Sequence, residues 1–336
     1  MNDPSYRAVV CTEPGPPERL ALQRLPRAPL TPGTARVAIK AAGINFPDLL
    51  MIEGKYQHRP ELPFVPGQEA AGIIAETAPE IDAFAVGQKV IVRMQTGGYA
   101  EEAIVPVDQI LELPAGFSFA EGATFFVAHI TAYHALATRA TLAPGQKLLV
   151  LGAAGGVGLA AVQIGKALGA VVIAAASTAE KLRSAGGCGA DHLINYSEEP
   201  VDEGIKRLTA GAGVEVVFDP VGIAQEVALR CVARDGKLLI AGFAGGSIPA
   251  YATNRILLRG CSVIGVRAGE AGRHNPQMRR RERAALRALA EQGLARPLVS
   301  ASYSLDRFAE AMQLLGDRRA IGRVALINGD QVTAQK

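Results

Sequence analysis

The stretch L-L-V-L-G-A-A-G-G-V-G, from Leu148 to Gly158, decides the fold of this 336-residue chain. An apolar run enters a glycine-rich turn and a helical pattern follows, so the fingerprint G-x-G-x-x-G fits with Ala153 in its first slot. Gly155 lets a pyrophosphate approach the backbone, and Gly158 lets the helix pack closely on the strand. The alternative is a packing turn that binds nothing. We expect a dinucleotide-binding turn formed by Ala153, Gly155, Gly156, Val157 and Gly158.

Strands and helices alternate along the chain from this turn onward. The pattern predicts strands at 147–151, 171–175, 192–195, 214–218, 237–241 and 261–266, and helices at 156–168, 179–185 and 201–209. Such alternation requires a parallel sheet covered on both faces, and the right-handed crossover rule makes that sheet doubly wound. The sequence therefore predicts an α/β fold.

The first 122 residues show a different pattern of short strands, such as Ala35–Ala41, among closely spaced prolines and glycines. We expect a β-rich domain at 1–122, the dinucleotide-binding domain at 123–264, and a return to the first domain at 265–336. The expected elements of the returning segment are helices at 276–291 and 306–315 and a closing strand at 321–327.

The end of the second predicted strand bears on the choice of cofactor. Folds that bind NAD usually carry an acidic residue there, about 20 residues past the fingerprint, to hold the ribose 2′-hydroxyl. This chain has Ala176, Ser177 and Thr178 instead. Without the carboxylate a 2′-phosphate is not repelled; Ser177 offers it a hydrogen bond, and Lys181 is either its cationic partner or a solvated helix lysine. The sequence predicts NADPH as the cofactor.

The side chains that hold zinc in many two-domain dehydrogenases are missing. No cysteine lies between residues 12 and 187, so the acidic candidates Asp48 and Glu69 have no cysteine partner at metal-site spacing. His129 and His134 are five residues apart, which places them on different faces of a helix and favours ordinary structural histidines. We therefore expect no metal at the reaction centre.

Composition argues against several other classes of protein. The net charge of +3 comes without an extended basic region, so nucleic-acid binding is not expected. The cysteines, Cys11, Cys188, Cys231 and Cys261, form no C-x-x-C pair, which favours a reducing compartment. There is no signal-peptide core, and glycines interrupt the apolar segment 148–176, so we expect a cytoplasmic protein without a membrane span.

Several motifs resemble those of one family over nearly the whole chain. Beside the glycine-rich turn they are G-I-N-F-P-D (43–48), G-K-Y (54–56), L-P-F-V-P-G-Q-E-A-A-G (62–72), G-G-Y-A-E (97–101), T-A-Y-H-A-L (131–136) and G-A-D-H-L-I-N-Y (189–196). They resemble the zinc-independent branch of the medium-chain dehydrogenase/reductase superfamily, close to the quinone oxidoreductases related to zeta-crystallin. Zinc-dependent relatives carry Cys where Ile44-Asn45 stands and His where Gln68 stands.

The resemblance implies a GroES-like catalytic domain, with a Rossmann nucleotide domain inserted between its two parts. It also implies that Asn45 and Thr131 border the nicotinamide and that Tyr196 lies near the adenosine phosphate. It also places Gly242, Phe243 and Arg323 near the cofactor.

Without metal, hydride transfer needs an acceptor that is already electrophilic, such as a quinone or an α,β-unsaturated carbonyl compound. We expect the protein to hold this small molecule against the cofactor and to exclude water. The predicted catalytic residues are Tyr56, Asn45 and Asp48. Tyr56 contacts the substrate or delivers a proton, or it is a structural loop tyrosine. Asp48 orients a water or caps a helix, and capping is the commoner role.

Two other functions fit the same residues. An enoyl-thioester reductase would bind acyl-CoA, and Arg280, Arg283 and Arg287 on the helix 276–291 could clamp its phosphate. A solvated basic face is the commoner interpretation of that arginine pattern. A non-catalytic, crystallin-like NADPH-binding protein would keep the glycine fingerprint and lack turnover.

The last predicted strand of the nucleotide domain, 261–266, points to self-association. It is almost wholly apolar, it follows Ile256, Leu257 and Leu258, and in the family's strand order it lies at the sheet edge. An apolar edge is an aggregation hazard unless something covers it. Either a helix or loop of the same chain covers it, or two subunits pair about a two-fold axis. We expect a homodimer centred on Ile256–Val266.

Overall fold

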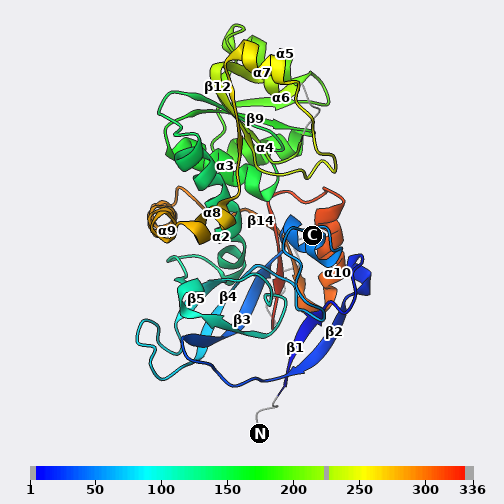
Figure 1. Ribbon diagram of the computed structural model, residues 1–336, viewed down its shortest axis with the longest axis vertical. Helices are drawn as coiled ribbons and strands as arrows, with labels where there is room; N and C mark the ends of the chain where they lie inside the picture. Colours follow the sequence, from blue (N-terminus) through cyan, green and yellow to red (C-terminus); the bar gives the residue numbers. More distant parts are fainter. Residues whose placement is uncertain (1–4, 223–226, 330–336) are drawn as a thin grey trace. The chain divides into compact units, whose positions relative to one another are not determined.

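The computed structural model describes residues 5–222 and 227–329. The chain divides into two compact units, residues 1–127 with 298–336 and residues 128–297 (Figure 1). Each unit has its own sheet and its own buried apolar cluster.

The first unit is built on a seven-stranded sheet and a separate two-stranded ribbon, β1-β2. The larger sheet has the strand order β14-β15-β3-β4-β5-β7, and β6 pairs with β3. The strands are Ser5–Val10 (β1), Ala21–Pro26 (β2), Thr34–Gly43 (β3), Glu69–Thr77 (β4), Lys89–Arg93 (β5), Glu102–Pro106 (β6), Ile110–Glu112 (β7), Val299–Ser304 (β14) and Arg323–Ile327 (β15). The helices are Pro17–Arg19 (η1), Phe46–Ile52 (α1), Val107–Gln109 (η2), Leu305–Arg307 (η4) and Phe308–Gly316 (α10).

Two predicted strands form the middle of this sheet. The strand expected at Ala35–Ala41 lies within β3, whose residues Val37 and Ile39 are buried in the apolar cluster. The closing strand expected at 321–327 is β15, which is buried at every position because β14 and β3 flank it. The end of the chain therefore completes the sheet that its first part begins, as predicted.

The second unit contains a six-stranded parallel sheet with the order β10-β9-β8-β11-β12-β13. The strands are Lys147–Val150 (β8), Val171–Ala176 (β9), His192–Asn195 (β10), Val214–Asp219 (β11), Val232–Ile240 (β12) and Ser262–Gly265 (β13). The helices are Phe119–Tyr133 (α2, whose residues up to Val127 belong to the first unit), His134–Arg139 (η3, a π-helical turn), Gly156–Ala167 (α3), Ala179–Gly187 (α4), Val201–Thr209 (α5), Val227–Cys231 (α6), Thr253–Arg259 (α7), Ala268–His274 (α8) and Pro276–Glu291 (α9). This is the predicted doubly wound α/β fold.

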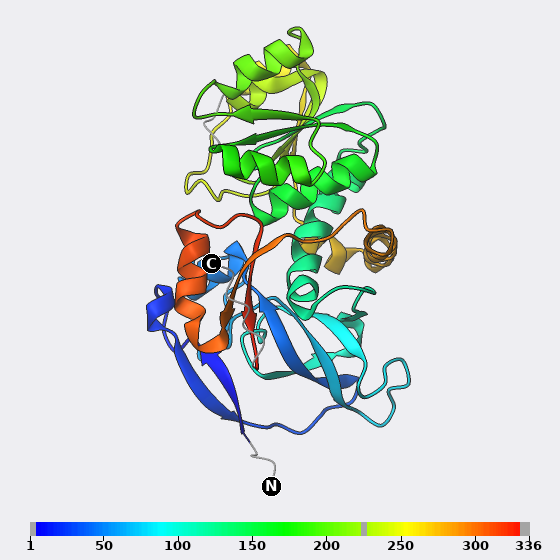
Figure 2. The same cartoon turned by 180° about the vertical axis from the view of Figure 1, so that it is seen from behind.

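Helices cover both faces of the parallel sheet. Helices α3 and α4 pack together and against β9, whereas α5 and α6 pack together on the opposite face (Figures 1 and 2). The central strands are accordingly apolar throughout, and Leu148, Leu149 and Val150 of β8 are fully buried. The apolar segment 148–176 is divided between β8, α3 and β9, and none of the described helices is long and apolar enough to cross a membrane.

The chain returns to the first unit later than expected, at Leu298 instead of residue 265. The reason is that α9 is anchored inside the second unit by a buried polar contact. Glu282 of α9 accepts hydrogen bonds from His134 Nδ1 at 2.8 Å and from Thr138 Oγ1 at 2.5 Å. His134 and Glu282 are only 2% and 4% exposed. In this contact His134 has the structural role that the sequence predicts.

Candidate active site

The glycine-rich turn joins β8 to α3 at the carboxyl end of the parallel sheet. Gly152 has the positive φ of +56° that favours glycine, so this residue, and not Ala153, makes the tight turn. Ala153 is buried, and its N–H donates to the carbonyl of Ala175 at 3.0 Å. The predicted strand, turn and helix are all present, and the turn begins one residue earlier than the fingerprint implies.

The two other fingerprint glycines have different surroundings. A Cβ added at Gly158 would collide with the carbonyl oxygen of Gly152 and lie 2.9 Å from Ala153 Cα. A Cβ added at Gly155 would meet only the carbonyl oxygen of Gly152, at 3.5 Å, so space is open there. Gly156 begins α3, where the first N–H groups of any helix find no acceptor within the helix. Open space beside such donors fits a pyrophosphate.

The carboxyl end of β9 carries no acidic residue, as the sequence indicates. Ser177 follows the strand with a half-buried side chain. Thr178 caps α4 by accepting the N–H of Lys181 at 3.3 Å, so Lys181 lies in the first turn of that helix. Tyr196 follows the neighbouring strand β10 and is 38% exposed. Ser177 and Tyr196 therefore stand at the ends of adjacent parallel strands.

Sequence reasoning missed the segment Asp219–Gly222, which begins at the last residue of β11. The sheet order places β11 beside β8, where the direction of the strand connections reverses, and dinucleotides bind at such switch points. Asp219 shapes the loop because its Oδ1 accepts the N–H groups of Val221 and Gly222 at 2.8 and 2.9 Å. Val221 reaches the glycine-rich turn, since a Cβ on Gly152 would lie 2.5 Å from Val221 Cγ2. The signal was an acidic residue at the end of a buried strand, with a glycine three residues later.

The next loop along this edge contains two more of the predicted cofactor residues. Gly242 and Phe243 follow β12, and a Cβ on Gly242 would lie 3.1 Å from the carbonyl oxygen of Pro220. Phe243 is 38% exposed. The structure therefore brings the loops after β11 and β12 together at the carboxyl edge. Thr131 lies on α2 with a half-buried side chain.

Three of the remaining predicted residues lie in a buried polar cluster of the first unit. Its centre is Glu69, at the start of β4, which is fully buried. Glu69 Oε1 accepts hydrogen bonds from Asn45 Nδ2 at 3.1 Å and from Arg323 Nη2, and Oε2 accepts the N–H of Val127 at 2.9 Å. Arg323 also donates to Asn45 Oδ1 at 2.9 Å. Burial raises the pKa of Glu69, and the positive charge of Arg323 opposes that shift.

Asp48 lies beside these residues, in the first turn of α1. Its Oδ2 accepts the N–H of Asn45 at 2.9 Å and the O–H of Tyr99 at 2.8 Å. Its Oδ1 is buried and has no hydrogen-bond partner among the described residues. Burial raises the pKa of Asp48 to about 7, although the hydrogen bonds from Asn45 and Tyr99 lower it. Tyr99, fully buried, was not singled out from the sequence, although it lies in the motif G-G-Y-A-E.

These contacts limit what several predicted site residues can do. Asn45 is 3% exposed with both ends of its amide engaged, and Asp48 is 0% exposed and caps α1. The Nη2 group of Arg323 is held by Glu69 and Asn45. Tyr56 differs, because it follows α1 with a half-buried side chain, and its N–H donates to the carbonyl of Leu50 at 3.1 Å. Contact of these residues with cofactor or substrate stays a prediction.

No group of three or more His, Cys, Asp and Glu side chains in the described part of the chain is arranged to hold a metal ion. Glu69 is instead surrounded by an amide, a guanidinium and a backbone N–H, which are hydrogen-bond donors and not co-ligands. Zinc independence stays a prediction.

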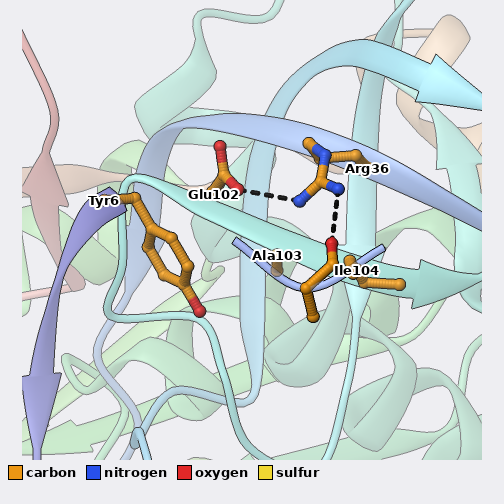
Figure 3. Close-up of a pocket in the computed structure, with 6 residues that line it drawn as sticks. Tyr6, Arg36, Glu102, Ala103 and Ile104 are labelled. Atoms are coloured by element: carbon orange, nitrogen blue, oxygen red, sulfur yellow. Dashed lines mark hydrogen bonds and ion pairs between the residues drawn. The ribbon is translucent and has the colours of Figure 1, made fainter. Parts of the chain in front are cut away.

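A cavity of about 110 Å³ lies elsewhere in the first unit (Figure 3). Its lining residues are Tyr6, Ala28, Arg36, Glu102, Ala103 and Ile104. Glu102 forms ion pairs with Arg36 at 2.8 Å and with Arg27 at 2.7 Å, while Arg36 also pairs with Glu76 at 3.0 Å. Its charged groups thus neutralise one another, and none of the predicted site residues lines it. We do not assign it to the active site.

The arginines considered for a phosphate clamp lie along α9. Arg280 and Arg287 are exposed and Arg283 is half-buried. Arg287 Nε pairs with Glu291 at 2.7 Å, one helical turn away. Pairing of this kind is typical of a solvated helix face.

Comparison with known proteins bears on the family. The family model described as "Alcohol dehydrogenase GroES-like domain" matches residues 31–115, and the one described as "Zinc-binding dehydrogenase" matches residues 156–291. A protein of Nematostella vectensis named "Quinone oxidoreductase-like protein 2 homolog" is 36% identical over 325 residues, which cover 96% of this chain and 89% of that one.

Solved structures agree with this match. A probable oxidoreductase from Mycobacterium abscessus superposes with a TM-score of 0.88 at 36% identity, covering 97% of this chain and 100% of the other. Quinone oxidoreductase of Escherichia coli, solved in complex with NADPH, superposes with a TM-score of 0.87 at 30% identity, covering 96% and 99%. The chain therefore belongs to the medium-chain dehydrogenase/reductase superfamily of oxidoreductases, among its quinone oxidoreductase-like members. The predicted family and fold class are confirmed.

Proposed function

We propose that this protein is an NADPH-dependent reductase that transfers hydride to a quinone or another α,β-unsaturated carbonyl compound without zinc. The observation that carries the proposal is the carboxyl edge of the parallel sheet, where the open position at Gly155 adjoins a β9 end that lacks an acidic residue. The NADPH complex of the E. coli relative supports the choice of cofactor.

The cofactor supplies the hydride when it is bound, and this chain supplies the groups that would hold it. The N–H groups of Gly156 and Val157 would receive the pyrophosphate in the space beside Gly155. The side chains proposed to contact a 2′-phosphate are Ser177, Lys181 and Tyr196. The loops 219–222 and 242–243 are available to the remaining part of the cofactor.

On the substrate side, reduction of a conjugated carbonyl consumes one proton for each hydride. The proton comes from water or from Tyr56, whose phenol O–H can donate one. Among the three predicted catalytic residues, Tyr56 is the one whose side chain is half-buried and not fully buried. It is therefore the first residue to mutate in a test for a proton donor. The remaining work of the protein is to hold the acceptor and exclude water.

The preference for NADPH over NADH tests the contacts that we propose for the 2′-phosphate at the end of β9. Because β9 ends without an acid, NADPH should bind at least about tenfold more tightly than NADH, a difference of about 1.4 kcal/mol. Ser177→Asp should reverse the preference, since its carboxylate would repel a 2′-phosphate and accept a ribose hydroxyl. Gln277→Glu, which adds the same charge at an exposed position of α9, should leave it unchanged. Equal dissociation constants for both nucleotides by calorimetry would refute the assignment.

The reaction is tested by NADPH oxidation against quinones, short enones and enoyl-CoA esters. We expect turnover with quinones or enones, and no loss of activity after dialysis against a strong chelator. Turnover with enoyl-CoA alone would identify an enoyl-thioester reductase. Tight NADPH binding without turnover on any acceptor would identify a non-catalytic protein. Stoichiometric zinc that is lost together with activity would contradict the metal-free reaction.

A further inference from the structure

Two carboxyl groups and one cation share the buried cluster of the first unit. Asp48 and Glu69 are both 0% exposed, and Arg323 is the guanidinium that bonds to Glu69. If both carboxyls were ionised, these three side chains would carry a net negative charge away from water, and the half-buried Arg93 of β5 would be the further cation acting on Glu69. Burying an uncompensated charge costs several kcal/mol. Ionisation of one carboxyl therefore disfavours ionisation of the other.

The hydrogen bonds around Glu69 match an ionised carboxylate. Both of its oxygens accept, from Asn45 Nδ2, from Arg323 Nη2 and from the N–H of Val127. All three groups are donors, and one of them is a cation. A carboxylate is an acceptor at both oxygens, so this surrounding favours the anion.

The hydrogen bonds around Asp48 match a neutral carboxylic acid. Oδ2 accepts two hydrogen bonds, from the N–H of Asn45 and the O–H of Tyr99, which use both lone pairs of a carbonyl oxygen. Oδ1 is buried, and neither a donor nor an acceptor among the described residues reaches it. An anionic oxygen at this position would be a desolvated charge with nothing to compensate it, whereas a hydroxyl there would leave only a neutral donor unpaired, which costs less.

We propose that Asp48 is a buried proton-binding site, with its Oδ1 protonated in the folded protein at pH 6 while Glu69, in the same cluster, is ionised. The ligand is a proton taken up from solvent on folding. This assignment makes the three side chains electrically neutral as a set. It concerns the first unit alone and stands whether or not the proposed reduction is correct.

The groups that face Asp48 come from four elements, and the sign of their effect on pH dependence follows from them. They are the backbone N–H of Asn45 before α1, Tyr99 from the segment between β5 and β6, Glu69 from β4 and Arg323 from β15. A carboxyl whose pKa is raised on folding, here to about 7, binds its proton more tightly in the folded state. Its contribution to stability is complete below the unfolded pKa, near 3.9, and is lost as pH rises toward the folded pKa.

Asp48→Asn tests the site because asparagine imitates the neutral acid. Between about pH 4 and pH 7 the unfolding constant of the unmodified protein should rise roughly tenfold per pH unit relative to that of Asp48→Asn, and the ratio should be level above that range. Glu69→Gln is the matched control, since it neutralises the other carboxyl and leaves Arg323 without its anion. It should destabilise the protein at every pH. The measurement is denaturant unfolding of the full chain across this pH range.

A second measurement needs no variant and holds even if Asp48→Asn fails to fold. The unmodified protein, labelled with ¹³C at aspartate carboxyls, should show one carboxyl with the chemical shift of a protonated acid at pH 6. That signal should titrate toward the ionised shift near pH 7. The inference is overturned if every aspartate carboxyl has the ionised shift at pH 6. It is equally overturned if the stability ratio of Asp48→Asn to the unmodified protein does not change with pH.

Discussion

Gly155 and Gly158 lie three residues apart in one turn, yet a glycine is required at each for a different reason. Position 158 has no room for a Cβ because the chain itself occupies the space, whereas position 155 has room that the chain leaves open. A substitution at Gly158 should therefore damage the fold, and the same substitution at Gly155 should damage binding.

Alanine at each position makes this difference measurable. Gly158→Ala should lower the free energy of unfolding by about 1–3 kcal/mol through overpacking, against the helix propensity of alanine, which favours it by about 1 kcal/mol. Gly155→Ala should change that free energy by no more than about 1 kcal/mol. Its dissociation constant for NADPH should rise at least about tenfold, because the methyl group fills the space proposed for the pyrophosphate. Denaturant unfolding and calorimetry give the two quantities, and equal effects of both variants on stability would contradict the distinction.

The burial of the candidate site residues could not be predicted from the sequence. Asn45, Asp48 and Arg323 are recognisable in the sequence as residue types at particular positions, but their burial cannot be read from it. The cluster depends on pairs that are far apart in the chain, 51 residues for Asp48 with Tyr99 and 254 for Glu69 with Arg323. Only the folded sheet brings these residues together, because β4 and β15 both neighbour β3.

At the scale of elements, α9 is held in place by buried hydrogen bonds that cannot be predicted from the sequence of the helix alone. Most of the helix is Arg and Ala, yet Glu282 is buried against His134 and Thr138, while Glu291 is exposed and pairs with Arg287. Two glutamates of one helix therefore have very different surroundings, which allows a matched comparison.

Glu282→Ala should lower the free energy of unfolding by about 2–4 kcal/mol, because His134 and Thr138 lose their buried acceptor. Glu291→Ala should cost less than about 0.5 kcal/mol, as expected for an exposed pair one helical turn apart. Hydrogen exchange along α9 should accelerate in Glu282→Ala and stay unchanged in Glu291→Ala. Similar losses in both variants would show that the buried contact does not anchor the helix.

The parallel sheet was predicted well because its strands are apolar runs separated by turn residues. The strand 192–195 and the helices 201–209 and 276–291 have the predicted bounds. The segment around α9 was predicted as a helix but assigned to the other domain. Helical periodicity reports which residues lie on one face, and it does not report that Glu282 meets His134, 148 residues earlier. The short helices α7 and α8 were missed for a related reason, since seven residues hold too few periodic positions.

At the scale of the whole molecule, the edge of the parallel sheet bears on self-association. β13 pairs with β12 and ends the strand order, so its outer side pairs with no strand of the described chain. The edge position predicted for the strand 261–266 is therefore confirmed. Leu257 and Leu258 of the preceding helix α7 are 79% and 74% exposed, and Val263 in β13 is 36% exposed. If a helix or loop of the same chain covered this edge and its apolar neighbours, these two leucines would be buried, whereas they are exposed.

We expect two copies of the chain to pair through this edge about a two-fold axis, which would satisfy the open strand and bury the leucines of both subunits. Val263→Asp should prevent the pairing, because a carboxylate buried in the interface without a partner costs several kcal/mol. Val86→Asp is the control, since Val86 is 64% exposed in a loop of the first unit and should leave the assembly unchanged. Light scattering at micromolar concentration should give a dimer mass for the unmodified protein and for Val86→Asp, and a monomer mass or aggregates for Val263→Asp. A monomer mass for the unmodified protein would rule out the dimer. A dimer mass for Val263→Asp would place the interface on another surface.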